Sequence, residues 1–168
     1  AFIDLETTGA NPEHDRITEI GIVEVEGDKV ERWSTLVNPQ RSIPEFIQRM
    51  TGISNDMVSD APPFEAVADE LKTRLKGRLF VAHNARFDYG FVRQEFRRLG
   101  ARFQSDVLCT VRLSRALFPE HHKHNLDSLI ARHSLTANDR HRALADADLI
   151  WQFWQTLRRD LDDTRILD

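Results

Sequence analysis

Alternating apolar and charged positions mark the first part of the chain as strands. Residues 17–26 (ITEIGIVEVE) alternate with a period of two, and residues 30–37 (VERWSTLV) follow a Gly27-Asp28 pair that is typical of a turn. We therefore expect an antiparallel hairpin with one face exposed to water. Residues 2–5 also fit a short, buried strand.

After residue 38 the hydrophobic pattern changes to a helical period. Strands that come first and then alternate with helices are typical of an α/β fold, in which helices flank a mixed sheet. Neither an internal repeat nor a linker interrupts the pattern, so we expect a single domain over residues 1–168. The elements predicted for this part are a helix at 62–76, a strand at 79–82, a helix at 87–99 that ends at Gly100, and helices at 110–118, 126–133 and 143–160.

Composition indicates a globular protein that does not cross a membrane. Hydrophobic residues make up 40% of the chain and charged residues 30%, and no apolar run approaches the roughly 18 residues of a membrane span. The single cysteine, Cys109, cannot form an internal disulfide, which favours the reducing cytoplasm. The chain starts at Ala1, inside a predicted strand and without a methionine, so we expect a fragment of a longer protein.

The charge is unevenly distributed along the chain. The net charge is −4, yet residues 83–142 contain eleven Lys/Arg against six Asp/Glu. This segment would suit contact with phosphates, although an ordinary uneven surface explains the count equally well. The arginines that are candidates for such contacts are Arg86, Arg93, Arg97, Arg112, Arg115, Arg140 and Arg142.

Asp4 and Glu6 are two carboxylates on a strand that is otherwise apolar. Residues two apart on a strand point to the same side, so these side chains would lie next to each other. Neighbouring carboxylates repel each other unless a cation lies between them, and Mg²⁺ or Mn²⁺ prefers oxygen ligands. The alternative is a solvated strand end without a metal.

Two further polar clusters follow later in the chain. The segment HNARFD places Asn84 and Asp88 after the strand at 79–82, where ligands gather in α/β sheets, although either residue also fits a simple helix cap. The segment HRALAD places His141 five residues before Asp146, at the start of a predicted helix. Asp148 lies about 200° further around that helix and cannot share the same site. A lone histidine in such a place is otherwise structural or exposed.

Together the three clusters resemble the DEDDh exonucleases, a family that includes ribonuclease T and the proofreading epsilon subunit of bacterial replicative DNA polymerase. Asp4 and Glu6 match the first motif, Asp88 the second, and His141 with Asp146 the third. The resemblance implies a ribonuclease H-like fold with a mixed five-stranded sheet flanked by helices on both sides. It also implies that these four carboxylates hold two divalent cations, Mg²⁺ or Mn²⁺, and that His141 is the general base.

The same resemblance implies a substrate and the residues that grip it. The expected activity is 3′→5′ hydrolysis of single-stranded or frayed DNA, with RNA 3′ ends as an alternative substrate. A module tethered to a polymerase or a second nuclease is a further alternative. At Thr51 the family often has a histidine, so contacts there would differ. The expected substrate-binding residues are Thr7, Thr8, Gly9, Met50, Thr51, Asn84 and Phe87.

Overall fold

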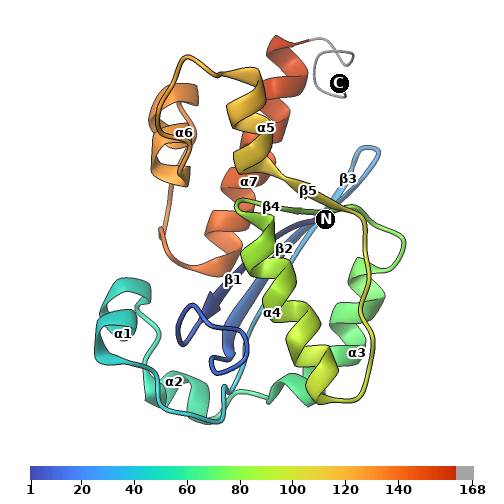
Figure 1. Ribbon diagram of the computed structural model, residues 1–168, viewed down its shortest axis with the longest axis vertical. Helices are drawn as coiled ribbons and strands as arrows, with labels where there is room; N and C mark the ends of the chain where they lie inside the picture. The colour runs from blue at the N-terminus through green and yellow to red at the C-terminus, as the bar shows by residue number, and fades with distance from the viewer. Residues whose placement is uncertain (162–168) are drawn as a thin grey trace.

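The computed structural model describes residues 1–161, so the last seven residues of the predicted domain lie outside the described part. Its sheet has the strand order β3-β2-β1-β4-β5 (Figure 1). β2 runs antiparallel to β1 and β3, whereas β1, β4 and β5 are parallel, which confirms the expected mixed five-stranded sheet. The strands are β1 (Phe2–Thr7), β2 (Ile17–Glu26), β3 (Lys29–Leu36), β4 (Phe80–Ala82) and β5 (Val107–Cys109).

The five predicted helices are confirmed to within about two residues at their ends. They are α3 (Phe64–Leu75), α4 (Ala85–Arg98), α5 (Thr110–Leu117), α6 (Leu126–His133) and α7 (Ala143–Asp160). Two short helices, α1 (Glu45–Thr51) and α2 (Asn55–Ser59), were not predicted, and neither was β5. With seven, five and three residues, these elements are too short for a hydrophobic period to emerge.

Hydrophobic clusters cover both faces of the sheet. Ile3 and Leu5 of β1 face one cluster with α3 and α4, whereas Phe2 faces a second cluster with α6 and α7. The helices therefore flank the sheet on both sides, as expected (Figure 1). α1 and α2 form a small separate layer around Ile43 and Ile47. No helix within residues 1–161 combines the length and apolar composition needed to cross a bilayer.

The predicted water-exposed face of the hairpin is wrong for β2. Every residue from Ile17 to Glu24 is buried, because β2 lies between two strands and has helices on both faces. Its charged positions are buried as ion pairs: Glu19 with Arg142 at 2.7 Å and Glu24 with Arg74 at 3.2 Å. The alternation of apolar and charged residues thus indicated paired charges rather than exposure.

The first turn of α7 rests directly on β2. A Cβ atom added at Gly21 would overlap the backbone of Ala143 and Leu144, so the two backbones touch at this glycine. Glu19 lies on the same side of β2, and its carboxylate accepts a 2.7 Å hydrogen bond from the Ala143 N–H. Glycine and glutamate at these two positions therefore fix the height and the start of α7 above the sheet.

Gly21→Ala is expected to lower the free energy of unfolding by about 1–3 kcal/mol, because the added methyl group meets backbone that cannot rotate away. Gly90→Ala is the matched control. Gly90 lies within α4 with open space around its Cα, so alanine there should stabilise the protein by up to about 1 kcal/mol. Urea unfolding of both variants measures the difference, and equal stability of the two would contradict this packing.

Candidate active site

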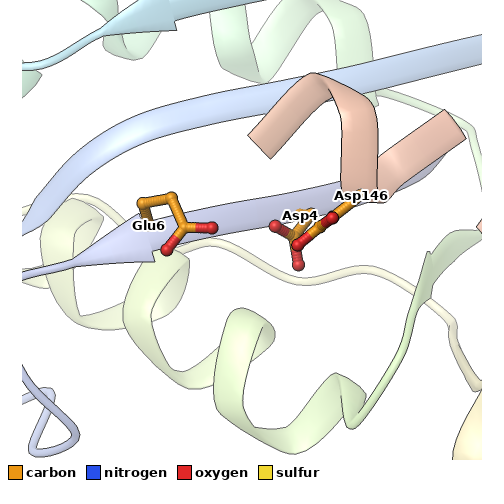
Figure 2. A group of neighbouring side chains, drawn as sticks. All are labelled: Asp4, Glu6 and Asp146. Atoms are coloured by element: carbon orange, nitrogen blue, oxygen red, sulfur yellow. The ribbon is translucent and has the colours of Figure 1, made fainter. Parts of the chain in front are cut away.

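Three carboxylates from distant parts of the chain meet beside the centre of the sheet. Asp4 and Glu6 lie on the side of β1 that faces α7, because their neighbours Ile3 and Leu5 point into the opposite cluster. Asp146 reaches the same place from the first turn of α7 (Figure 2). One oxygen from each of these three side chains lies within 4.8 Å of the others. The sequence prediction that they converge is confirmed.

Asp88 joins the site through the open edge of β1. β4 pairs with β1 only at Phe2 and Val81, so the backbone of β1 beyond that pair is free on this side. The Leu5 N–H donates a 3.2 Å hydrogen bond to Asp88 Oδ1, which places this carboxylate beside the strand between Asp4 and Glu6. Asp88 stands outside the 4.8 Å group, but its charge acts on Asp4.

The helix-cap alternative does not hold for either residue of the second cluster. Asn84 occupies the N-cap of α4 in the left-handed region, with φ of 68°, but its side chain makes no capping hydrogen bond. Asp88 lies a full turn further on, buried, and bonds to β1 instead of to the start of its own helix.

The four carboxylates are held together at a large electrostatic cost. Burial, followed by the charge of Asp88, raises the pKa of Asp4 well above its ordinary value. Burial and the charge of Asp146 raise the pKa of Glu6 to about 8. Burial also raises the pKa of Asp88 and of Asp146. Ionised together, these groups require positive charge among them.

The geometry of the site fits a divalent cation. Asp4 Oδ2 is buried and has no hydrogen-bond partner among the described residues, although buried carboxylate oxygens are normally satisfied. Oxygen ligands of this kind are those that hard divalent ions prefer. Asp4, Glu6 and Asp146 are placed to hold such an ion directly, with Asp88 next to Asp4.

Arg140 supplies positive charge at the edge of this group. Its guanidinium lies 2.6 Å from Asp146 Oδ2 and 3.0 Å from Asp127 Oδ1, so it links the first turns of α7 and α6. Arg140 and Arg142, two of the arginines that the sequence offered as candidates for phosphate contacts, are thus engaged within the protein, Arg142 with Glu19. A sequence alone gives no signal for which arginine finds an internal partner.

His141 lies in the loop that leads into α7. It adopts a left-handed backbone with φ of 68°, and its N–H donates to Asp146 Oδ1 at 3.4 Å. The histidine charge contributes to lowering the pKa of Asp146, although burial of that carboxyl outweighs it. The imidazole is half-buried and makes no hydrogen bond within residues 1–161, so its nitrogens are free for another partner.

The residues after the first motif form a turn whose hydroxyl groups are already used. Thr7 Oγ1 donates to the Gly9 carbonyl at 2.6 Å. Thr8 is fully buried and its hydroxyl donates to Asp15 at 2.9 Å. A Cβ at Gly9 would overlap the Asp15 carboxylate, so a larger residue here would require this side chain to move. Contacts from these hydroxyls to a substrate, expected from the sequence, do not fit this geometry, which leaves only the backbone of the turn for that role.

The remaining predicted contact residues differ in exposure. Thr51 is buried, and its hydroxyl donates to the Ile47 carbonyl at 2.8 Å, so its side chain does not fit the expected role either. Met50 beside it is 51% exposed. Asn84 is exposed, and Phe87 is half-buried, with its ring 4.8 Å from that of Phe91. These last three remain accessible on the molecular surface.

Sequence reasoning missed Glu19, which positions Asp146 without touching it. The Glu19 carboxylate holds the Ala143 N–H and the Arg142 guanidinium at the start of α7. The only signal in the sequence was a charged residue in a strongly apolar strand, and the same pattern is typical of a solvated strand.

Comparison with known proteins agrees with this geometry. Residues 1–152 match the family described as exonuclease (RNase_T). The chain is 45% identical over 150 residues to the 3′-5′ exonuclease DinG of Bacillus subtilis, which covers 88% of this chain and 16% of that protein. It is 40% identical over 145 residues to a PolC-type DNA polymerase III of Caldanaerobacter subterraneus, which covers 86% of this chain and 10% of that protein.

Solved structures give the same picture. Exonuclease X, in complex with 5′ overhanging duplex DNA, superposes with a TM-score of 0.74 at 27% identity, over 94% of this chain and 90% of that one. The sheet with helices on both faces is the ribonuclease H-like fold that the resemblance implied. Exonucleases of this family generally depend on divalent metal ions.

The chain spans about a sixth of the length of the DinG relative and a tenth of the PolC relative. Within that span, the family match covers all three motifs, and the fold brings their four carboxylates together. The chain belongs to the exonuclease family.

Proposed function

We propose that this chain is a metal-dependent 3′→5′ exonuclease that acts on single-stranded or frayed DNA and releases nucleoside 5′-monophosphates. The observation that carries the proposal is the meeting of Asp4, Glu6 and Asp146 within 4.8 Å, with Asp88 at the adjoining strand edge. The names of the relatives support DNA as the substrate, and the DNA complex of exonuclease X supports it as well.

In the proposed site, Asp4, Glu6 and Asp146 would hold one divalent ion, Mg²⁺ or Mn²⁺, and Asp4 with Asp88 would hold a second. Such ions would supply activation of a water molecule and stabilisation of the departing alkoxide. The raised pKa values of these carboxyls support this assignment, because each would ionise readily only next to added positive charge.

The other roles fall to groups around the carboxylates. His141 takes the proton from the attacking water, since it lies next to Asp146 and its ring nitrogens have no partner within residues 1–161. The backbone of the turn from Thr7 to Gly9 approaches the terminal nucleotide. Asn84, Phe87 and Met50 are placed as contacts for its sugar and base, and their exposure supports this role.

The lengths of the relatives bear on the kind of protein in which this domain works. Because DinG and PolC are several times longer than this chain, we propose that it acts as one module of a larger protein, joined to a polymerase or another enzyme. The half-buried, unpaired Cys109 fits the reducing cytoplasm. RNA 3′ ends are the alternative substrate, to be compared directly with DNA.

The proposal is tested with 5′-labelled single-stranded DNA and RNA of the same sequence. A ladder of shortened products should form on DNA with Mg²⁺ and disappear with chelator. His141→Ala should lower the rate by about 10²–10⁴-fold, the usual contribution of a general base, while metal binding by calorimetry persists. His122→Ala, the same change at an exposed loop position, is the control. A metal-independent ladder, or wild-type turnover by His141→Ala, would contradict these assignments.

Burial of Glu6 predicts that the metal-free protein loses stability as the pH rises from about 4.5 to about 8. The folded state raises the pKa of Glu6 to about 8 from an ordinary 4.5, so it binds this proton more tightly than the unfolded chain does. Between these two values the unfolded chain has lost the proton that the folded state keeps, and the free energy of unfolding therefore falls with rising pH. The control is Glu6→Gln, which keeps the shape and removes the titration.

The quantity to measure is the difference in melting temperature between wild type and Glu6→Gln, with chelator present. Taking this difference cancels the contributions that other titrating groups make to the melting temperature. One such group is His83, because burial lowers its pKa to about 4. The difference should grow in favour of the glutamine variant towards pH 8 and shrink when Mg²⁺ is added. A difference that is constant with pH would show that Glu6 is not held next to other carboxylates.

Arg140→Gln should tighten metal binding. The guanidinium pairs with Asp146 in the metal-free site, so a bound cation must compete with it for the same carboxylate. Removing this charge also makes the site more negative. Calorimetric titration with Mn²⁺ should give a lower dissociation constant than wild type, with Arg32→Gln, which removes an ion pair to Asp148, as the control. Weaker binding would mean that Arg140 holds Asp146 in place for the metal.

A further inference from the structure

A groove begins beside the candidate site and runs between α4 and α5. It has a volume of about 1120 Å³, and its near end is lined by His83 and Asn84. Asn84 stands one helical turn before Asp88, so the groove starts directly next to the carboxylate group. α5 forms its other wall with Arg112 and Arg115. If the 3′ end of a DNA strand lies at the carboxylates, the nucleotides on its 5′ side would enter this groove.

The groove carries positive charge that no residue of the described part of the chain neutralises. Arg86, Arg112 and Arg115 line it and are exposed, and its lining from residues 1–161 includes no aspartate or glutamate. In the described part of the chain, none of these three guanidinium groups has an ion-pair or hydrogen-bond partner. Six of the other arginines are paired with carboxylates at 3.2 Å or less: Arg16, Arg32, Arg74, Arg98, Arg140 and Arg142. Arg93, Arg97 and Arg102 also form no ion pair within residues 1–161, but they do not line the groove.

Unpaired arginines in one groove of an acidic protein indicate an anionic ligand. The net charge of −4 would favour pairing, yet these three remain free together. Arg112 and Arg115 are three residues apart on α5, so their side chains share one helical face. A row of guanidinium groups along a groove matches the regular spacing of charges on a nucleic-acid backbone better than it matches a single small anion.

The walls of the groove are held in place by the hydrogen bonds of two histidines, the half-buried His83 and the buried His124. His83 Nδ1 lies 2.8 Å from the Thr110 hydroxyl at the start of α5, and its Nε2 donates to the His124 carbonyl at 2.7 Å. His124 in turn bonds to Ser114 of α5 at 2.7 Å. These bonds tie the start of α4 to α5, so the groove exists before any ligand arrives. Burial lowers the pKa of His83 to about 4, so its ring adds no charge at neutral pH.

We propose that this groove binds the phosphates of the DNA strand on the 5′ side of the bond being cut, with Arg112 and Arg115 as the main contacts and Arg86 across from them. The inference rests on the proposed exonuclease function for its direction, since the 3′ end must lie at Asp4 and Glu6. The lining of the groove includes these three of the seven arginines that the sequence offered as candidates.

Binding of single-stranded DNA in chelator tests the groove without any hydrolysis. Fluorescence anisotropy would compare a dinucleotide with an oligonucleotide of about 12 nucleotides over a range of salt concentrations. Each arginine–phosphate contact adds about 0.7 to the slope of log affinity against log salt, so Arg112→Gln/Arg115→Gln should lower that slope by about 1.4. At 0.1 M salt this corresponds to about 25-fold weaker binding of the long strand.

The double variant Lys29→Gln/Arg159→Gln is the matched control. Both residues are exposed and lie outside the groove, at the β2–β3 turn and near the end of α7, and removing them lowers the net charge by the same amount. Its slope and affinity should equal those of wild type. An equal loss in this control would show that only overall charge matters, which would overturn the proposal.

Two other results would also overturn the proposal that this groove binds DNA phosphates. An unchanged slope for Arg112→Gln/Arg115→Gln would exclude phosphate contacts at these arginines. Equal losses for the dinucleotide and the long strand would place the effect at the carboxylates or on folding. Cleavage is measured in the separate ladder assay. A domain that binds single-stranded DNA through the groove but cleaves nothing would contradict the proposed function, whereas the proposed role of the groove in binding would remain supported.

Discussion

The repulsion among carboxylates that the fold forces together governs this molecule. Asp4, Glu6 and Asp146 lie within 4.8 Å, and the charge of Asp88 also acts on Asp4. Burial raises the pKa of each, so the protein holds them in a state that favours either protons or a cation. Arg140 offsets part of this charge from one side. At neutral pH such carboxyls ionise together only where positive charge lies among them, which is the condition that the proposed divalent ions would meet.

The scaffold tolerates that repulsion because each carboxylate is carried by a rigid element. Asp4 sits on a central strand, and Asp146 sits on a helix whose backbone touches β2 at Gly21. Glu19 ties the start of that helix to the sheet through the Ala143 N–H. The shortness of β4 leaves the edge of β1 free, which allows the Leu5 N–H to hold the fourth carboxylate. Separation of the charges would require breaking these packing and hydrogen-bond contacts, so the geometry persists.

Internal pairing sorts the arginines of this chain into structural and available groups. Arg142 and Arg140 form ion pairs that hold α7 and the loop before it in place. Arg86, Arg112 and Arg115 line the groove and have no ion-pair partner among the described residues. A charge already paired with a buried carboxylate gains little from a phosphate, because it must first give up its partner. An unpaired guanidinium keeps its full attraction. This difference, together with the position of the groove, supports the proposal that Arg112 and Arg115 bind a nucleic-acid strand.

The sequence by itself determined five of the helices, four of the strands and the mixed sheet, and it singled out the five motif residues as candidates. Periodicity is a local property, and a carboxylate in an apolar strand, such as Asp4, marks a position that is either solvated or close to positive charge. The short elements α1, α2 and β5 were not predicted from the sequence, because tertiary contacts stabilise them and the local pattern does not. Only the tertiary structure decided which charges are paired, that β2 is buried on both faces, and that the hydroxyls of Thr8 and Thr51 point inward. These outcomes depend on partners far away in the chain, and no local pattern encodes such distances.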